Sequence, residues 1–243
     1  MIQEIVWLIQ NGADYARADG KPNVFRVPFM EFGHRDEFQV FAQLPHPRAM
    51  KTHVPYRYLP KSAREMKSKI VYIIRNPKDV MVSYYHFYRM NSDFGNFKGT
   101  WNDYFQYFMD QGKLLGYGNH YDHTLGYWQH RHDDNLFIVF YEDIIAKPEH
   151  IIRKLADFLG CKLSEECVDR IVQAIRFDVM KENPMTNMYF GPNHNFDHSI
   201  SPFFRKGKVG DWKNYFTDDQ NRIMDEMYEE RAKDSGLEFI YEL

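Results

Sequence analysis

The sequence has few cysteines, no long apolar run and no excess of charge of either sign. Its two cysteines, Cys161 and Cys167, lack the second pair that a zinc site would need, so we expect both to be reduced. No run of eighteen apolar residues and no secretory segment is visible, which argues against a membrane span. The formal net charge of −3 gives no general attraction to nucleic acid. We therefore expect a cytoplasmic protein with neither membrane nor nucleic acid as its partner.

Histidines are numerous, but they do not form a recognisable metal motif. Four of the eleven gather in one polar stretch, at His120, His123, His130 and His132. Their spacing does not provide the ligand frame that zinc sites use. We expect no metal.

Length and hydrophobic pattern predict one globular α/β domain over residues 1–243. The hydrophobic fraction of 44% is ordinary for such a domain. Buried strands are expected at 69–74 and 135–141, and helices at 148–160, 163–175 and about 218–235. The last helix is expected to turn Ile223, Met224, Met227 and Tyr228 inward. The stretch 185–208 is too long for a simple connection and suggests a lid.

A cationic segment at 205–214 is the clearest local signal in this slightly acidic chain. It reads Arg-Lys-Gly-Lys-Val-Gly-Asp-Trp-Lys-Asn, with Gly207 and Gly210 among four basic residues. Arginine binds phosphate oxygens in a bidentate way, and glycine lets the backbone approach a ligand closely. The segment predicts a phosphate site. The same composition also suits a solvated basic turn, and spacing alone does not decide between them.

A second segment reads as strand, turn and helix. Lys69 to Ile74 is the strand, 75–79 is the turn, and the helix is expected to open at Val80. Strand ends in α/β sheets and helix N-termini both favour anionic ligands, so Arg75 and Ser83 are well placed for a phosphate. Taken singly, such residues are more often a surface turn residue and an exposed helix hydroxyl.

Together these segments resemble the cytosolic sulfotransferases, and the resemblance runs through nearly the whole chain. The most specific matches are Arg-Asn-Pro-Lys-Asp-Val-x-Val-Ser-Tyr-Tyr-His-Phe from residue 75, the segment 205–214, and the stretches 51–55, 140–143, 181–187 and 197–203. The resemblance implies an enzyme that transfers a sulfonate from 3′-phosphoadenosine 5′-phosphosulfate to a hydroxyl or amine of a small acceptor. It also implies a three-layer, P-loop-like parallel sheet flanked by helices.

The resemblance further implies a role for individual residues. The 3′-phosphate would be held by Arg75, Ser83, Arg205, Lys206 and Gly207, and the adenine would lie near Tyr141 and Phe177. His53 would be the general base, a role that suits the ordinary pKa of histidine, about 6.5. The acceptor pocket would include Lys51, Phe29 and Phe32.

One family motif is absent from residues 1–243. The family carries a Tyr-Pro-Lys-x-Gly-Thr loop that holds the 5′-phosphosulfate, and here Met1–Gly12 resembles the helix that follows that loop. Loss of one positioned donor typically lowers a rate by about 10² to 10³. We therefore expect the chain as given to transfer sulfonate weakly or not at all.

Other readings stay open at this point. A non-catalytic protein could use the same anion site to bind a nucleotide or a small apolar ligand. A P-loop kinase would need a Walker loop and magnesium ligands, which are not apparent. The acceptor could be a phenol, another alcohol, a steroid or an amine. The family's dimer motif is altered at Asp218 and Arg222, so a homodimer is not confidently expected.

Overall fold

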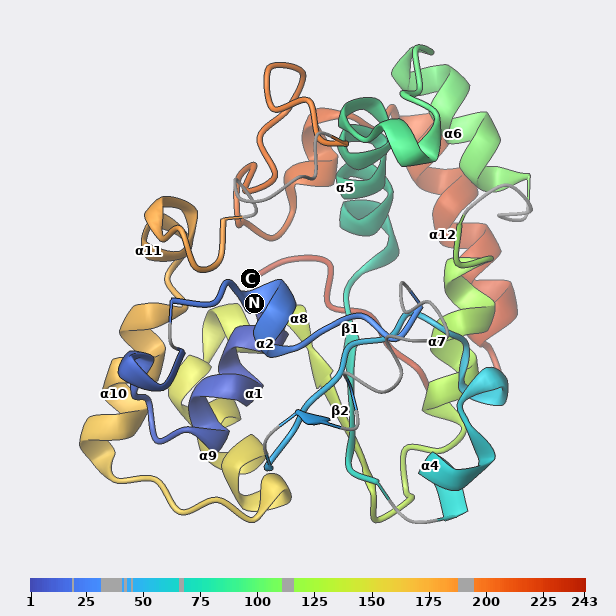
Figure 1. The fold of residues 1–243 in the computed structure, drawn as a ribbon. Helices are drawn as coiled ribbons and strands as arrows, with labels where there is room; N and C mark the ends of the chain where they lie inside the picture. Colours follow the sequence, from blue (N-terminus) through green and yellow to red (C-terminus); the bar gives the residue numbers. More distant parts are fainter. Residues whose placement is uncertain are drawn as a thin grey trace. The chain divides into compact units, whose positions relative to one another are not determined.

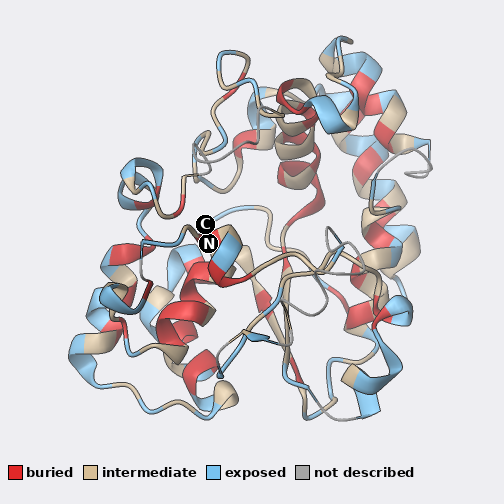
Figure 2. Ribbon diagram, viewed as in Figure 1, coloured by how far each residue is buried: buried red, intermediate tan, exposed pale blue. Residues whose placement is uncertain are grey.

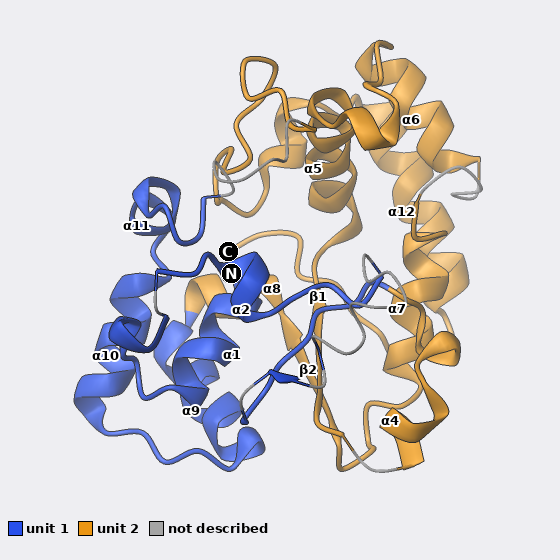
Figure 3. Ribbon diagram, in the orientation of Figure 1, with its two compact units in different colours: residues 1–53, 147–192 blue, residues 54–146, 193–243 orange. Residues whose placement is uncertain are grey.

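The computed structural model (Figure 1) describes residues 1–18, 20–31, 41, 43–44, 46–65, 68–110, 116–187 and 195–243. Buried side chains lie on most of its longer helices (Figure 2). Contacts divide the chain into two compact units (Figure 3). Unit 1 comprises Met1–His53 and Lys147–Pro192, and unit 2 comprises Val54–Ala146 and Asn193–Leu243. That residues 1–243 form a single domain stays a prediction.

Unit 1 is helical in the part that the structure describes. Its elements are α1 (Ile2–Gln10), η1 (Tyr15–Ala18), α2 (Asn23–Arg26), α9 (Pro148–Leu159), α10 (Glu165–Ala174) and α11 (Phe177–Glu182). Helix α1 contacts α9 and α10, and its residues Ile5, Leu8 and Ile9, spaced three and four apart, are at most 2% exposed. Helices α9 and α10 lie within the predicted spans 148–160 and 163–175: Pro148 begins α9, left-handed Gly160 ends it, and Ser164 caps α10.

A buried ion pair ties α1 to α2. Arg26 Nη2 lies 2.9 Å from Glu4 Oε2, and the Asn23 side-chain Nδ2 donates to the same oxygen at 2.5 Å. The Arg26 guanidinium also lies 4.2 Å from the centre of the Trp7 ring. Removing one partner of such a pair leaves an uncompensated buried charge, which is strongly destabilising. The network therefore holds α2 against α1.

Among the described residues, unit 2 contains two strands, which confirm the α/β class. Strand β1 (Ile70–Ile74) pairs in parallel with β2 (Leu136–Phe140), in a register that places Ile70 opposite Leu136 and Ile74 opposite Phe140. Both strands are rich in β-branched and aromatic residues, which favour a pleated, packed environment. The predicted strand at 135–141 is one residue too long at each end, since β2 begins at Leu136 and Tyr141 begins a helix.

Helix α5 (Pro77–Met90) begins three residues earlier than predicted. The side chain of Asn76 accepts the Asp79 amide at 2.8 Å and caps the helix, and Pro77 occupies the first helical position. Proline needs no amide partner there, so it starts the helix rather than interrupting it. The prediction of Val80 as the first residue was wrong for this reason.

The other elements in the described part of unit 2 are helices and short 3₁₀ turns, some of which contribute to an aromatic core. They are η2 (Tyr56–Tyr58), α4 (Lys61–Glu65), η3 (Ser92–Phe94), α6 (Trp101–Met109), α7 (His120–Trp128), α8 (Tyr141–Ala146), η4 (Asp211–Asn214) and α12 (Asp218–Ala232). The core includes Tyr104, Phe105, Met224 and Tyr228. Met224 and Tyr228 point inward as predicted, but Ile223 is 40% exposed, so its expected burial was wrong.

No helix in the described ranges is long and apolar enough to cross a membrane. The described residues of the predicted lid, 185–187 and 195–208, form turns and one bridge but no helix or strand. Residues 188–194 lie outside the described part, and the lid role stays a prediction.

Candidate functional site

The structure brings together the two cationic segments that the sequence predicted separately. Arg75 follows the last residue of β1, and its Nη2 atom donates to the carbonyl of Lys208 at 3.4 Å. Helix α5, which starts two residues later, contacts η4 of the 205–214 segment. A strand end, a helix N-terminus and the basic loop therefore meet within unit 2.

Arg75 lies between an aromatic ring and a carboxylate. Its guanidinium carbon is 4.4 Å from the centre of the Tyr141 ring, and its Nη2 is 3.7 Å from Asp79 Oδ2. Burial raises the pKa of Tyr141, although the nearby Arg75 opposes this. The Nε atom of Arg75 is buried without a hydrogen-bond partner among the described residues. This arginine thus keeps one unused donor.

Arg205 and Lys206 share one carboxylate. Lys206 Nζ donates to Asp211 Oδ1 at 2.6 Å, and Arg205 Nη1 lies 2.6 Å from Asp211 Oδ2 in an ion pair that is not aligned as a hydrogen bond. Burial would raise the pKa of Asp211, but these cations and Asn214 hold it below its ordinary value. The two cations are therefore oriented by a charged acid.

Glycines shape the loop between these contacts. Gly207 and Gly210 have φ values of +64° and +85°, a region that other residues rarely adopt. Ser83 lies in the second turn of α5, half-buried. The predicted phosphate ligands Arg75, Ser83, Arg205, Lys206 and Gly207 all belong to unit 2.

His86, one turn beyond Ser83, adds a neutral group to this cluster. Its Nε2 pairs with the Tyr215 hydroxyl at 2.7 Å. Burial, followed by the charges of Arg205 and Arg89, lowers its pKa to about 4, against the opposing charge of Asp211. His86 is therefore uncharged at neutral pH. The cations of the cluster remain the two arginines and Lys206.

Unit 1 contains the second predicted cluster, around His53. The His53 ring stacks on Phe29 with 5.2 Å between centroids, and Lys51 Nζ lies 4.1 Å from the centre of the Phe29 ring. Backbone pairing sets this arrangement: the Lys51 amide donates to Pro28 at 2.8 Å, and Met30 donates to Lys51 at 2.9 Å. The structure therefore brings Phe29, Lys51 and His53 together.

Glu31 completes the His53 cluster. It accepts the Thr52 hydroxyl at 2.9 Å and the backbone amide of His53, while His53 Nδ1 lies 3.9 Å from its Oε1 atom. Burial lowers the pKa of Lys51 to about 8, and Glu31 opposes that change. The cluster thus combines an imidazole, a lysine that loses its proton more readily than usual and an aromatic ring.

Two predicted residues are not joined to these clusters. Phe32 lies outside the described residues. Phe177 is the first residue of α11 in unit 1, whereas Tyr141 begins α8 in unit 2. A shared adenine contact between Phe177 and Tyr141 stays a prediction.

The sequence prediction missed the acids of both clusters, namely Asp79, Asp211 and Glu31. Asp79 carried a visible signal, because it stands three residues after a capping Asn76. Asp211 follows a glycine in the basic segment, but nothing local indicates that it binds the two cations preceding it. The role of Glu31 depends on a contact with a segment 21 residues away.

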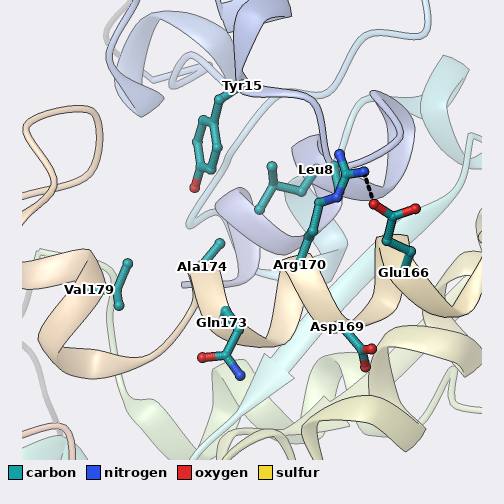
Figure 4. Close-up of a pocket in the computed structure, with 9 residues that line it drawn as sticks. Leu8, Tyr15, Glu166, Asp169, Arg170, Gln173, Ala174 and Val179 are labelled. Carbon is teal, nitrogen blue, oxygen red and sulfur yellow. Dashed lines mark hydrogen bonds and ion pairs between the residues drawn. The ribbon is translucent and has the colours of Figure 1, made fainter.

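A groove of about 510 Å³ is present elsewhere in unit 1 (Figure 4). It is lined by Leu8, Ala13, Tyr15, Glu166, Asp169, Arg170, Gln173, Ala174 and Val179. Arg170, its one cationic residue, is already paired with Glu166. None of the predicted site residues lines it. Across the described ranges, no group of three or more His, Cys, Asp or Glu is arranged to hold a metal ion.

Comparison with known proteins identifies close relatives. The family model "Sulfotransferase domain" matches residues 1–236. Sulfotransferase 1C2 of Rattus norvegicus is 42% identical over 245 residues, which cover 100% of this chain and 82% of that protein. Sulfotransferase 1A1 of Bos taurus is 42% identical with the same coverage.

Solved structures agree with these relatives. Retinol dehydratase in complex with retinol and PAP matches with a TM-score of 0.86 and 26% identity, covering 99% of this chain and 79% of that one. Mouse sulfotransferase SULT7A1 complexed with PAP matches with a TM-score of 0.76 and 33% identity, covering 87% and 76%. The predicted resemblance and α/β fold are confirmed.

Proposed function

Because the chain belongs to the sulfotransferase family and is a transferase by that membership, we propose that its co-substrate is 3′-phosphoadenosine 5′-phosphosulfate. The sulfonate would pass to a hydroxyl or amine of a small acceptor. The observation that carries this proposal is the cation cluster of unit 2, in which Arg75, Arg205 and Lys206 gather at a strand end and a helix N-terminus.

The chemistry of the cluster fits a phosphate group. Arg75 Nε is a buried donor with no partner among the described residues, and the Arg205 pair with Asp211 is not aligned as a hydrogen bond. Both arginines therefore have donors available to an added oxygen. Phosphate offers several charged acceptors to such donors, which form short and strong bonds. The 3′-phosphate of the nucleotide is the group we assign to this cluster.

His53 is the residue we assign as general base. Its ring lies against Phe29 and near Lys51, so an acceptor hydroxyl approaching Phe29 would meet a nitrogen able to take its proton. In this proposal Lys51, Phe29 and Phe32 contact the acceptor. Two solved neighbours were crystallised with retinol and with androsterone, which are apolar alcohols. We infer an apolar hydroxyl compound for this chain. The non-catalytic alternative gains no support from the relatives, which are sulfotransferases by name.

Nucleotide selectivity tests the proposal most directly. Calorimetry would compare adenosine 3′,5′-bisphosphate with adenosine 5′-monophosphate, which lacks the group assigned to the cation cluster. Each charge-assisted bond contributes about 1.5 to 3 kcal/mol, so we expect the bisphosphate to bind at least about 10-fold more tightly. Equal affinities would refute the site assignment.

A further inference from the structure

One buried carboxylate, Asp79, connects the two cationic segments of unit 2. It is the third residue of α5, and its side chain is 1% exposed. Its Oδ2 atom accepts the Gly210 amide at 2.8 Å, and its Oδ1 atom accepts the Trp212 amide at 3.0 Å. The segment 205–214 has only the short η4 as regular structure, so these two bonds take the place of a helix or sheet in holding it.

The two amides flank the acid that orients the cations. Asp211 stands between Gly210 and Trp212, and it contacts Lys206 Nζ and Arg205 Nη1, each at 2.6 Å. Fixing the backbone on both sides of Asp211 fixes its carboxylate. The position of Asp79 is thereby transmitted to the two cations, which lie more than 120 residues away in sequence.

Asp79 also contacts the other half of the cluster. Its Oδ2 atom accepts the Asn76 side-chain Nδ2 at 3.1 Å and lies 3.7 Å from Arg75 Nη2. The neighbouring Lys78 strengthens the same junction, since its Nζ lies 4.5 Å from the centre of the Trp212 ring. All three cations of the cluster therefore depend on the place of one acid.

We propose that Asp79 is a positioning residue for nucleotide binding, which fixes Asp211 through the Gly210 and Trp212 amides and so orients Arg205 and Lys206. The inference rests on the proposed function, because the 3′-phosphate is the ligand assigned to these cations. Asp79 does not touch the phosphate in this arrangement. A carboxylate in direct contact would repel it.

Asp79→Asn tests the proposal while keeping the size of the side chain. It removes the charge and replaces one acceptor oxygen with a donor, so one loop amide loses its partner. We expect the affinity ratio of adenosine 3′,5′-bisphosphate to adenosine 5′-monophosphate to fall about 10-fold or more. Asp103→Asn is the matched control, because Asp103 has the same third position in α6 and accepts the Thr100 amide at 2.7 Å. It should leave the ratio unchanged.

A double-mutant cycle separates positioning from a general loss of stability. If Asp79 acts through Arg205, the effects of Asp79→Asn and Arg205→Ala on the ratio should be clearly less than additive. Full additivity, or a fall in melting temperature with an unchanged ratio, would overturn the inference. If Asp79→Asn shows no folding transition, Asp79→Glu takes its place, since it keeps the charge but displaces it by one methylene. It too should lower the ratio, and an unchanged ratio would overturn the inference.

The unsubstituted chain distinguishes the two proposals. If it shows no preference for the bisphosphate, the proposed function fails, and the role of Asp79 fails with it. If it shows the preference and Asp79→Asn retains it, only the role of Asp79 fails.

Discussion

In unit 2, Arg205 and Lys206 are oriented by the charge of Asp211, whereas in unit 1 His53 is placed by backbone pairing and by the ring of Phe29. The first arrangement matches cations with a buried acid from the same loop. In the second, His53 Nδ1 lies 3.9 Å from Glu31 Oε1, which is longer than a hydrogen bond. Groups that hold an anion gain from fixed charge, whereas a general base must exchange a proton with its substrate.

The largest expected effect comes from removing the imidazole. His53→Ala should lower turnover by about 10² to 10⁴, the usual contribution of a general base, with bisphosphate affinity almost unchanged because the assigned cations lie in unit 2. The measurement is sulfonate transfer to a test phenol. It is made on the 243-residue chain and on a version extended before Met1 by a Tyr-Pro-Lys-x-Gly-Thr strand and loop. His132→Ala, at an exposed position, is the control. Turnover of the extended version that is indifferent to His53→Ala would remove His53 from the reaction.

The reverse pattern is expected in unit 2. Arg205→Ala should weaken adenosine 3′,5′-bisphosphate binding by about 10- to 100-fold while changing 5′-monophosphate binding much less. Calorimetry with both nucleotides measures this. Lys213→Ala provides a control in the same segment, because Lys213 is half-exposed and pairs with Glu242 at 2.6 Å. An equal loss for both nucleotides would show that Arg205 supports the fold rather than the 3′-phosphate.

Lys51 gives a pH-dependent test of unit 1. Burial lowers its pKa to about 8 in the folded chain, so the unfolded chain binds more protons between this value and the ordinary value of 10.5. The free energy of unfolding of the chain therefore rises with pH through this window because of Lys51. Relative to Lys51→Met, the unsubstituted chain should gain about 1 to 3 kcal/mol across it, as measured by urea denaturation. Parallel pH profiles for the two proteins would contradict the lowered pKa.

The smallest expected effect concerns the ring beneath Arg75. Tyr141→Leu removes a cation–π contact worth about 0.5 to 1 kcal/mol, so bisphosphate affinity should fall about two- to five-fold. Tyr141→Phe keeps the ring and should bind like the unsubstituted chain. If Tyr141→Phe instead lost as much affinity as Tyr141→Leu, the hydroxyl rather than the ring would be the important group.

Local sequence signals predicted the elements well where one residue controls an end. Gly160 ends α9 and Ser164 caps α10 as expected, because the backbone chemistry of these residues acts within a few positions. The start of α5 was missed because Asn76 and Pro77 were read as a turn. The prediction for Ile223 was wrong because helical spacing indicates which face of a helix is apolar but not how much of that face other residues cover.

The basic residues of the candidate site could be identified from the sequence, but the contacts that orient them could not. Arg75, Arg205 and Lys206 are visible in sequence as basic residues beside glycines or strand ends. Asp79 is marked locally by its place after Asn76, but its role is not visible, because the bonds that it accepts from Gly210 and Trp212 cross more than 130 residues. Such contacts depend on the tertiary fold, which no local pattern encodes.

The parallel register also constrains how the chain tolerates insertions and deletions. Ile74 pairs with Phe140, so the next residues, Arg75 and Tyr141, leave the sheet side by side. The guanidinium carbon of Arg75 lies 4.4 Å from the centre of the Tyr141 ring. Deleting one residue from either five-residue strand would invert the alternation of its side chains. Such a deletion would move Arg75 away from Tyr141 even though both residues were retained. Changes in length are therefore expected in the loops and not in these strands.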